Sequence, residues 1–128
     1  MNSKEFINWA DYNEFSFGKF VAKRRQELGI STRKLASKIG ISAVYLSDIE
    51  HGSRKAPENY MPQFIEHLQI TEKELDNFYI MAYVTKGKYF EFKEYLNENH
   101  YARTFLRLAK AKNLSDQEWQ KIISYLKG

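Results

Sequence analysis

The chain has 128 residues, 43% of them hydrophobic and 16% aromatic, enough for one compact domain or a small domain with an appended helical piece. It contains no cysteine, which excludes disulfides, cysteine-ligated zinc and thiol catalysis and indicates a reducing compartment. No apolar run approaches the roughly 20 residues that a membrane span needs, and residues 1–5 lead into no hydrophobic signal core. We therefore expect a cytoplasmic globular protein.

The net charge of +4 is concentrated in one third of the chain. Residues 16–56 hold nine Lys or Arg and three Asp or Glu, whereas the other residues hold eleven basic and thirteen acidic ones. A concentrated basic surface attracts phosphate groups and releases their counterions, although a merely solvated surface can have the same composition. The charge distribution makes nucleic acid a candidate partner.

The first half of the chain is predicted to form short helices. A short helix over 5–13 precedes a longer one over 17–28, which Ser16 caps and Gly29 ends. The next two helices cover 32–38 and 43–50, with Ser31 and Ser42 as their caps and Gly40 as the break between them.

Helices are also predicted in the second half. One covers 60–68, and a capping box at 71–74 opens another that runs to about Val84. A hairpin across 79–92 is an alternative, since Tyr, Val and Phe favour strands, but two strands alone are marginally stable and we prefer a helix over 88–97.

Two amphipathic helices complete the chain. Asn99 caps a helix over 100–112, and a second capping box at 115–118 opens the last helix. We expect an apolar stripe on each helix: Ala102, Phe105, Leu106 and Ala109 on the first, and Trp119, Ile122, Ile123 and Leu126 on the second.

The most informative stretch is 32–50. Counting Thr32 as the first position, Ala36 is fifth, where two helices cross closely, and Gly40 is ninth, in a turn that favours a positive φ. The remaining matching positions are apolar and must be buried against neighbouring helices: Leu35, Ile39, Ile41, Leu46 and Ile49. The pattern predicts two short helices joined by a tight turn, with the second exposed along one side.

On these residues, the chain resembles the Xre/Cro/CI family of helix-turn-helix regulators over about 16–83. The resemblance implies an all-α fold: a five-helix Cro/CI-type helix-turn-helix domain with an appended C-terminal helical segment. It also implies a homodimer that binds double-stranded DNA at a palindromic operator and places helix 43–50 in the major groove. Thr32 stands where the family often has Gln, and the base-facing residues are less polar than in many phage repressors.

The resemblance also assigns site residues by position. The expected DNA base contacts are Ala43, Val44, Tyr45, Ser47 and Asp48. The expected DNA phosphate contacts are Thr32, Arg33, Lys34, Ser42, Ser53, Arg54 and Lys55. Arg25 and Glu50 match positions that pair in relatives, which implies a structural salt bridge.

No catalytic signature is found, and we expect no enzyme, cofactor or metal site. His51, His67 and His100 lack metal-ligand spacing, and His51 is expected to face DNA or solvent. The Glu residues within 91–98 fall on one face of an expected helix, and we interpret this face as solvated.

We expect three segments: an N-terminal extension over 1–15, the helix-turn-helix domain over 16–84, and a C-terminal segment over 85–128. Three interpretations of the last segment remain open: core packing, dimerisation, or binding of a protein partner through 86–128. The sequence thus favours a dimeric repressor, with an antitoxin or other interaction protein as the alternative.

Overall fold

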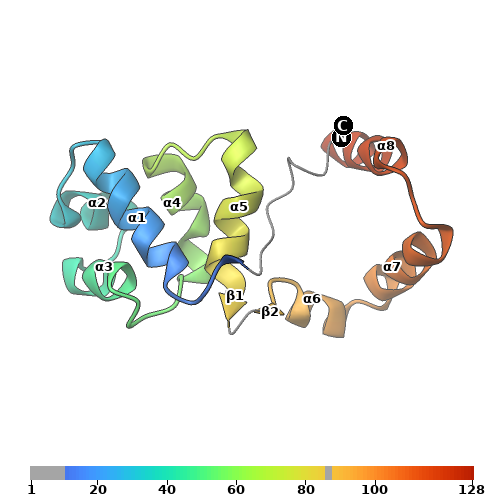
Figure 1. Cartoon of the computed structure of the whole chain (residues 1–128), viewed down its shortest axis with the longest axis horizontal. Helices are drawn as coiled ribbons and strands as arrows, with labels where there is room; N and C mark the ends of the chain where they lie inside the picture. The colour runs from blue at the N-terminus through green and yellow to red at the C-terminus, as the bar shows by residue number, and fades with distance from the viewer. Residues whose placement is uncertain (1–10, 86–87) are drawn as a thin grey trace. The chain divides into compact units, whose positions relative to one another are not determined.

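The computed structural model describes residues 11–85 and 88–128, which form two compact units (Figure 1). The first unit comprises the described residues up to Glu91, and the second comprises 92–128. The all-α prediction is confirmed, since helices dominate both units. Within the described residues, no helix is long and apolar enough to cross a bilayer.

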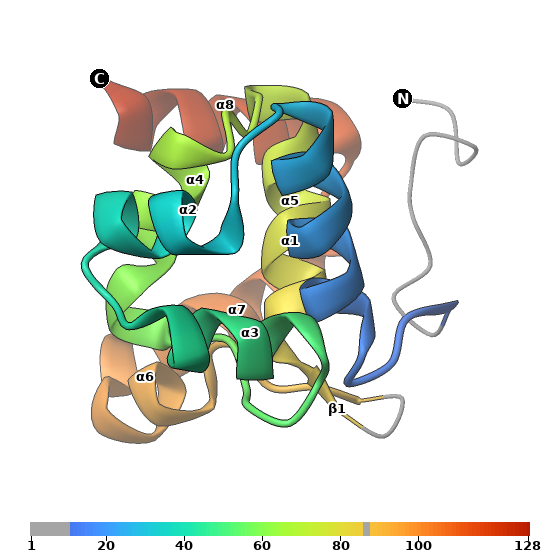
Figure 2. The ribbon, with the colours of Figure 1, turned by 90° about the vertical axis from the view of Figure 1, so that its left-hand side faces the viewer.

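Five α-helices build the first unit. They are α1 (Ser16–Glu27), α2 (Thr32–Ile39), α3 (Ala43–Glu50), α4 (Met61–His67, after a 3-10 turn over Glu58–Tyr60) and α5 (Glu72–Tyr83). Figure 2 shows α2 and α3 side by side at the front of this unit. The expected helix over 5–13 lies largely outside the described residues.

The predicted caps define where most of these helices begin. The hydroxyl of Ser31 accepts a hydrogen bond from the backbone N–H of Lys34, and that of Ser42 accepts one from Tyr45. Thr71 and Glu74 form the expected capping box at the start of α5. Each cap satisfies an N–H group that has no partner inside its helix.

The core of the first unit is aromatic at its centre. Phe17 of α1 lies 5.7 Å from Phe64 of α4 and 5.1 Å from Phe78 of α5, measured between ring centroids. Fully buried aliphatic side chains surround these rings, among them Val21, Leu35, Leu46, Ile49 and Leu68. Burial of each such side chain contributes about 1.5–3 kcal/mol, so packing and not intrinsic propensity holds helices this short in place.

Two details differ from the sequence predictions. Ser16 is the first residue of α1 and not its cap, because the helix begins directly after Phe15 and the Ser16 hydroxyl accepts from the N–H of Asn13. The preferred helix over 88–97 is also wrong. The chain forms strand β1 (Val84–Thr85), antiparallel to β2 (Lys88–Tyr89), before helix α6 begins at Lys93.

Burial explains why so small a hairpin forms. Val84 is only 2% exposed, so the hairpin is anchored in the first unit and does not stand alone. Tyr89 adds a hydrogen bond from its hydroxyl to the Glu91 carboxylate. Burial of that carboxylate raises its pKa above the usual range.

The second unit consists of α6 (Lys93–Glu98), α7 (His100–Lys112) and α8 (Asp116–Lys127). Asn99 caps α7, and Ser115 and Glu118 form a capping box on α8. Arg103 donates to the carbonyl of Leu96 at 2.6 Å, which satisfies one carbonyl at the end of α6.

Candidate nucleic-acid interface

Helices α2 and α3 are joined by a tight turn at Gly40. Gly40 has φ +95°, a left-handed conformation that side-chain-bearing residues rarely adopt. The carbonyl of Ala36 accepts from the N–H groups of both Gly40 and Ile41, which closes the end of α2. The apolar positions Leu35 and Leu46 are completely buried, so the pair has a fixed inner side and a fixed outer side.

The close approach that sets the position of α3 comes from α1 and was not foreseen. A Cβ on Gly18 would lie 2.1 Å from the carbonyl oxygen of Ile49 and 3.0 Å from that of Glu50. Only a glycine permits α1 and α3 to touch through their backbones in this way. Ala36, which was expected at a close crossing of two helices, is only 1% exposed.

A second tie between α1 and α3 is electrostatic. Arg25 donates from Nε to one oxygen of Glu50 at 2.8 Å and from Nη2 to the other at 3.0 Å. Its Nη1 donates to the carbonyl of Ile30 at 3.0 Å. The hydrogen bonding of the Arg25 guanidinium to the Glu50 carboxylate raises the pKa of Arg25, which therefore remains charged. This is the pair that the resemblance to the helix-turn-helix family implied.

The outer side of α3 carries the residues predicted to contact bases. Val44 is 72% exposed, and the positions 43, 47 and 48 lie on the same side of the helix by the 3.6-residue period. Ala43, Ser47 and Asp48 are half-buried. Tyr45 lies at the edge of this side, with its ring packed partly against the core.

The loop after α3 is fastened to the helix. The carbonyl of Asp48 accepts from the N–H of Ser53 at 2.9 Å and from that of Arg54 at 3.3 Å. The Arg54 guanidinium lies over the Tyr45 ring, 5.4 Å from its centroid, a cation–π contact that the sequence did not indicate. Ser53, Arg54 and Lys55 are all exposed.

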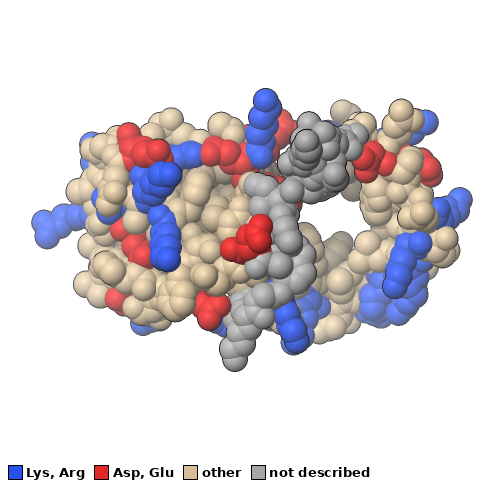
Figure 3. Space-filling view, viewed as in Figure 1, with Lys and Arg blue, Asp and Glu red and all other residues tan. Residues whose placement is uncertain are grey.

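The residues predicted to contact phosphates thus come from three places: the first turn of α2, the start of α3 and the loop after α3. Arg33 and Lys34 are exposed in the first turn of α2, where Thr32 is half-buried, and Ser42 is exposed at the start of α3. Figure 3 shows basic side chains projecting at the edge formed by α2 and α3, with acidic side chains interspersed on the same face.

His51 lies beside this surface. Its Nδ1 is 2.7 Å from the carbonyl oxygen of Ser47 and 3.4 Å from the Ser47 hydroxyl. The first distance fits an Nδ1–H that donates to the carbonyl. The exposed imidazole is thereby held against the last turn of α3, close to the predicted base-facing side.

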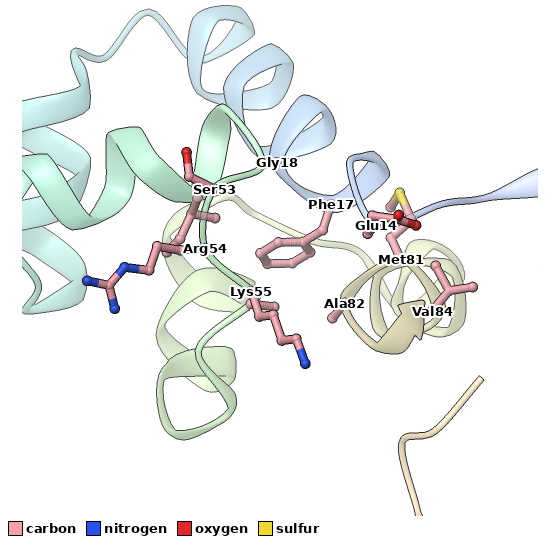
Figure 4. A pocket seen from close by; sticks show the side chains of 12 residues that line it. Glu14, Phe17, Gly18, Ser53, Arg54, Lys55, Met81, Ala82 and Val84 are labelled. Carbon is pink, nitrogen blue, oxygen red and sulfur yellow. The ribbon is translucent and has the colours of Figure 1, made fainter. Parts of the chain in front are cut away.

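A cavity of about 290 Å³ lies behind the loop (Figure 4). The ring of Phe17 faces it, whereas the guanidinium of Arg54 points away from it. Met81, Ala82 and other apolar groups line much of its wall. Among the described residues, no cluster of His, Asp or Glu could hold a metal ion.

This arrangement of five helices, with a tightly turned pair and an exposed second helix, defines a helix-turn-helix domain. Residues 16–78 match the family described as "Helix-turn-helix domain". The chain is also 33% identical over 58 residues to two proteins called uncharacterized HTH-type transcriptional regulators, from Mycobacterium tuberculosis strains CDC 1551 and H37Rv.

Each of these two matches covers 45% of this chain and 41% of the relative, so the chain spans less than half of the relatives' length. No solved structure matches the chain significantly. The family match and the names of the two relatives both point to a helix-turn-helix regulator.

Proposed function

We propose that this chain is a sequence-specific, double-stranded DNA-binding regulator of transcription that acts as a dimeric repressor in the cytoplasm. The observation that carries the proposal is the outer side of α3, where Val44 is 72% exposed while the inner side is completely buried. A helix held in this way presents its side chains to the major groove, which is wide enough to admit it.

The base-facing residues suggest a readout that combines apolar and polar contacts. The methyl groups of Ala43 and Val44 suit thymine methyl groups, and the Ser47 hydroxyl suits either a donor or an acceptor. The carboxylate of Asp48 suits the amino group of cytosine. In this proposal Tyr45 reaches a base or a phosphate from the edge of the helix.

The surrounding residues would fix the register on the duplex. Arg33, Lys34, Arg54 and Lys55 supply positive charge, and the hydroxyls of Thr32, Ser42 and Ser53 supply donors to phosphate oxygens. Ser42 already caps α3 through its oxygen and keeps its O–H for a phosphate. The fastening of the loop to Asp48 gives Arg54 a fixed position relative to α3.

Repression would follow from occlusion. Two copies that insert their α3 helices into successive major grooves, roughly 34 Å apart, would read a palindromic operator and cover a promoter. The Arg25–Glu50 pair and Gly18 support this role because they fix α3 on the rest of the domain.

Selection of binding sites from random duplex DNA, at low and moderate salt, tests the proposal. Enrichment of an inverted repeat with half-sites one helical turn apart supports a dimer that reads an operator. Salt-sensitive binding with no enriched sequence would reduce the site to a non-specific basic surface and overturn the proposal.

The alternative function is an antitoxin or another interaction protein that uses its C-terminal helices to bind a partner. The exposed apolar side chains of α7 and α8 favour it, because such surfaces usually mark interaction sites. A chain that is monomeric when pure and binds DNA only together with a second protein would support this alternative.

A further inference from the structure

The cavity of about 290 Å³ behind the loop after α3 lies within the first unit. The ring of Phe17 faces it (Figure 4), and Met81 and Val84 complete an apolar floor of buried side chains. Protein interiors are close-packed, and a hollow of this volume is at the lower end of the range for ligand sites. The cavity therefore has room for one small molecule of roughly ten non-hydrogen atoms, and not for a peptide or a helix.

The outer wall of the cavity is a loop that the proposed function places on DNA. Residues 52–56 all line the cavity. The loop is fixed where it leaves α3, because a Cβ on Gly52 would lie 2.4 Å from the ring of Phe15 and because the carbonyl of Asp48 accepts from the next two N–H groups. Among the described residues, no hydrogen bond holds the backbone of Lys55. The wall is therefore rigid at its start and adjustable at Lys55.

Lys55 also gives the mouth of the cavity a cation. The guanidinium of Arg54, the other cation of the lining, points away and lies over the Tyr45 ring. Lys55 is exposed and has no ion-pair partner in the described part of the chain. Glu14, the one acidic residue among those that line the cavity, lies apart from Lys55, on a different side of the Phe17 ring (Figure 4). A small anion at the mouth would thus meet an unpaired ammonium group beside an apolar floor.

We propose that this cavity binds a small carboxylic acid with an apolar body, which pairs with Lys55 and withdraws that residue from DNA. The apolar body would lie against Phe17 and Met81, where burial of apolar surface and contact between a thioether and an aromatic ring stabilise it. The carboxylate would accept charge-assisted hydrogen bonds from the Lys55 ammonium group. The inference rests on the proposed function, because it assigns a regulating ligand to the same DNA-contacting loop.

The acid and a DNA phosphate would compete for one ammonium group. Loss of a single phosphate contact should weaken DNA binding about three- to tenfold and lower the slope of log affinity against log salt by about one. Since such coupling is reciprocal, DNA should weaken binding of the acid by the same factor. A molecule of this class would therefore act as an inducer that lifts repression.

The first test is titration calorimetry of the full chain without DNA. The probe is 3-phenylpropionate, and the expected dissociation constant is between about 10 µM and 1 mM for a ligand of this size. The uncharged 3-phenylpropanamide has nearly the same shape and is expected to bind at least about tenfold more weakly. Nuclear magnetic resonance should show the largest shifts of backbone amides at residues of the cavity, among them Phe17, Lys55 and Ala82.

Two variants place the probe in the cavity. Ala82→Leu fills the space and is expected to abolish binding of the acid, but should bind DNA as the wild type does, because Ala82 lies on α5 and outside the proposed DNA surface. Ala22→Leu is the matched control, since Ala22 is also half-buried and does not line the cavity. If Ala82→Leu failed to fold, Lys55→Met would take its place. Lys55 is exposed, and this variant should bind the acid no better than the amide.

Three results without DNA would overturn the inference. They are a wild-type chain that does not bind the acid, as expected if another part of the chain fills the cavity, equal binding of the acid and the amide, and a folded Ala82→Leu variant that binds the acid unchanged.

DNA measurements separate this inference from the proposed function. The acid should weaken DNA binding by the wild type and leave that of Ala82→Leu unaffected. Binding of the acid with no change in DNA affinity would overturn the inference and leave the proposed function standing. A chain that binds the acid but enriches no DNA sequence would overturn the proposed function and leave the binding site standing.

Discussion

Arg25 and Glu50 join the first helix to the end of the third through two nearly parallel hydrogen bonds, with side chains only 13% and 6% exposed. The fork geometry of the guanidinium matches both carboxylate oxygens at once, which an ammonium group cannot do. The position of α3 therefore depends on a pair that is largely removed from water.

Removal of one partner should be costly. Arg25→Ala leaves the Glu50 carboxylate buried and unpaired, and we expect the free energy of unfolding to fall by about 3 kcal/mol. Arg25→Lys should recover only part of this loss, while Arg25→Met combined with Glu50→Leu should recover most of it. Denaturant unfolding of the three variants checks this, and an unchanged midpoint for Arg25→Ala would contradict a structural role for the pair.

Gly18→Ala should destabilise the domain although alanine favours helices. Helix propensity alone predicts a gain of about 0.5–1 kcal/mol. The new methyl group would instead lie 2.1 Å from the Ile49 carbonyl oxygen, so α1 and α3 must separate at a cost of about 1–3 kcal/mol. Thermal melting gives the sign of the change. Gly29→Asn is the control, because Gly29 has a positive φ but nothing within 4 Å.

The ion pair between Arg24 and Glu74 makes stability depend on pH. The hydrogen bond that Arg24 donates, helped by hydrogen bonds from Thr71, lowers the pKa of the Glu74 carboxyl below its usual value. The ionised Glu74 carboxylate therefore stabilises the fold fully at a pH above the pKa that Glu74 has in the unfolded chain. This stabilisation is lost as the pH falls through the lower pKa that Glu74 has in the folded chain. Glu74→Gln should melt below the wild type at neutral pH, and the difference should close in acid. Glu66 is exposed, and for Glu66→Gln the difference in melting temperature from the wild type should not change in this way with pH.

Arg54→Ala and Lys34→Ala should weaken binding to all DNA sequences alike. If each residue contacts a phosphate, the slope of log affinity against log salt should fall by about one for each substitution. Lys73→Ala is the control, because α5 lies across the domain from α3 (Figure 1). Loss of preference at a single base pair in either variant would assign that residue to base readout instead.

Val44→Ser should alter sequence preference and leave folding intact. The side chain is 72% exposed, so stability should change by about 0.5 kcal/mol or less. Loss of its methyl groups should reduce discrimination at one base pair of each half-site by about 1–3 kcal/mol. Selection of binding sites repeated with this variant would show the reduced discrimination. An unchanged consensus sequence would mean that Val44 does not contact a base.

The helix-turn-helix region could be predicted closely because its signals are local. Ser31, Gly40 and Ser42 act within a few residues of themselves, and the structure has these caps and this turn where the sequence indicated them. The contact at Gly18 could not be predicted in this way. It depends on the distance between two helices that are far apart along the chain, and a glycine inside a helix has no local signature of that distance.

The errors near Val84 have the same origin. Val, Thr and Tyr are compatible with both a helix and a strand, and burial of Val84 in the first unit decided the outcome. The stacking of Arg54 on Tyr45 was also missed, because it depends on a loop path set by two hydrogen bonds to the carbonyl of Asp48.

The exposure of Val44 also bears on how such a protein diverges. The position of α3 depends on the close backbone approach at Gly18 and on the largely buried pair of Arg25 and Glu50. Val44, by contrast, is 72% exposed and does not belong to the core. Substitutions at this position are nearly neutral for folding and therefore accessible to mutation one at a time. Under the proposed function, duplicated genes built on this scaffold would acquire new DNA-sequence preferences by drift at the outer side of α3, without passing through an unfolded intermediate.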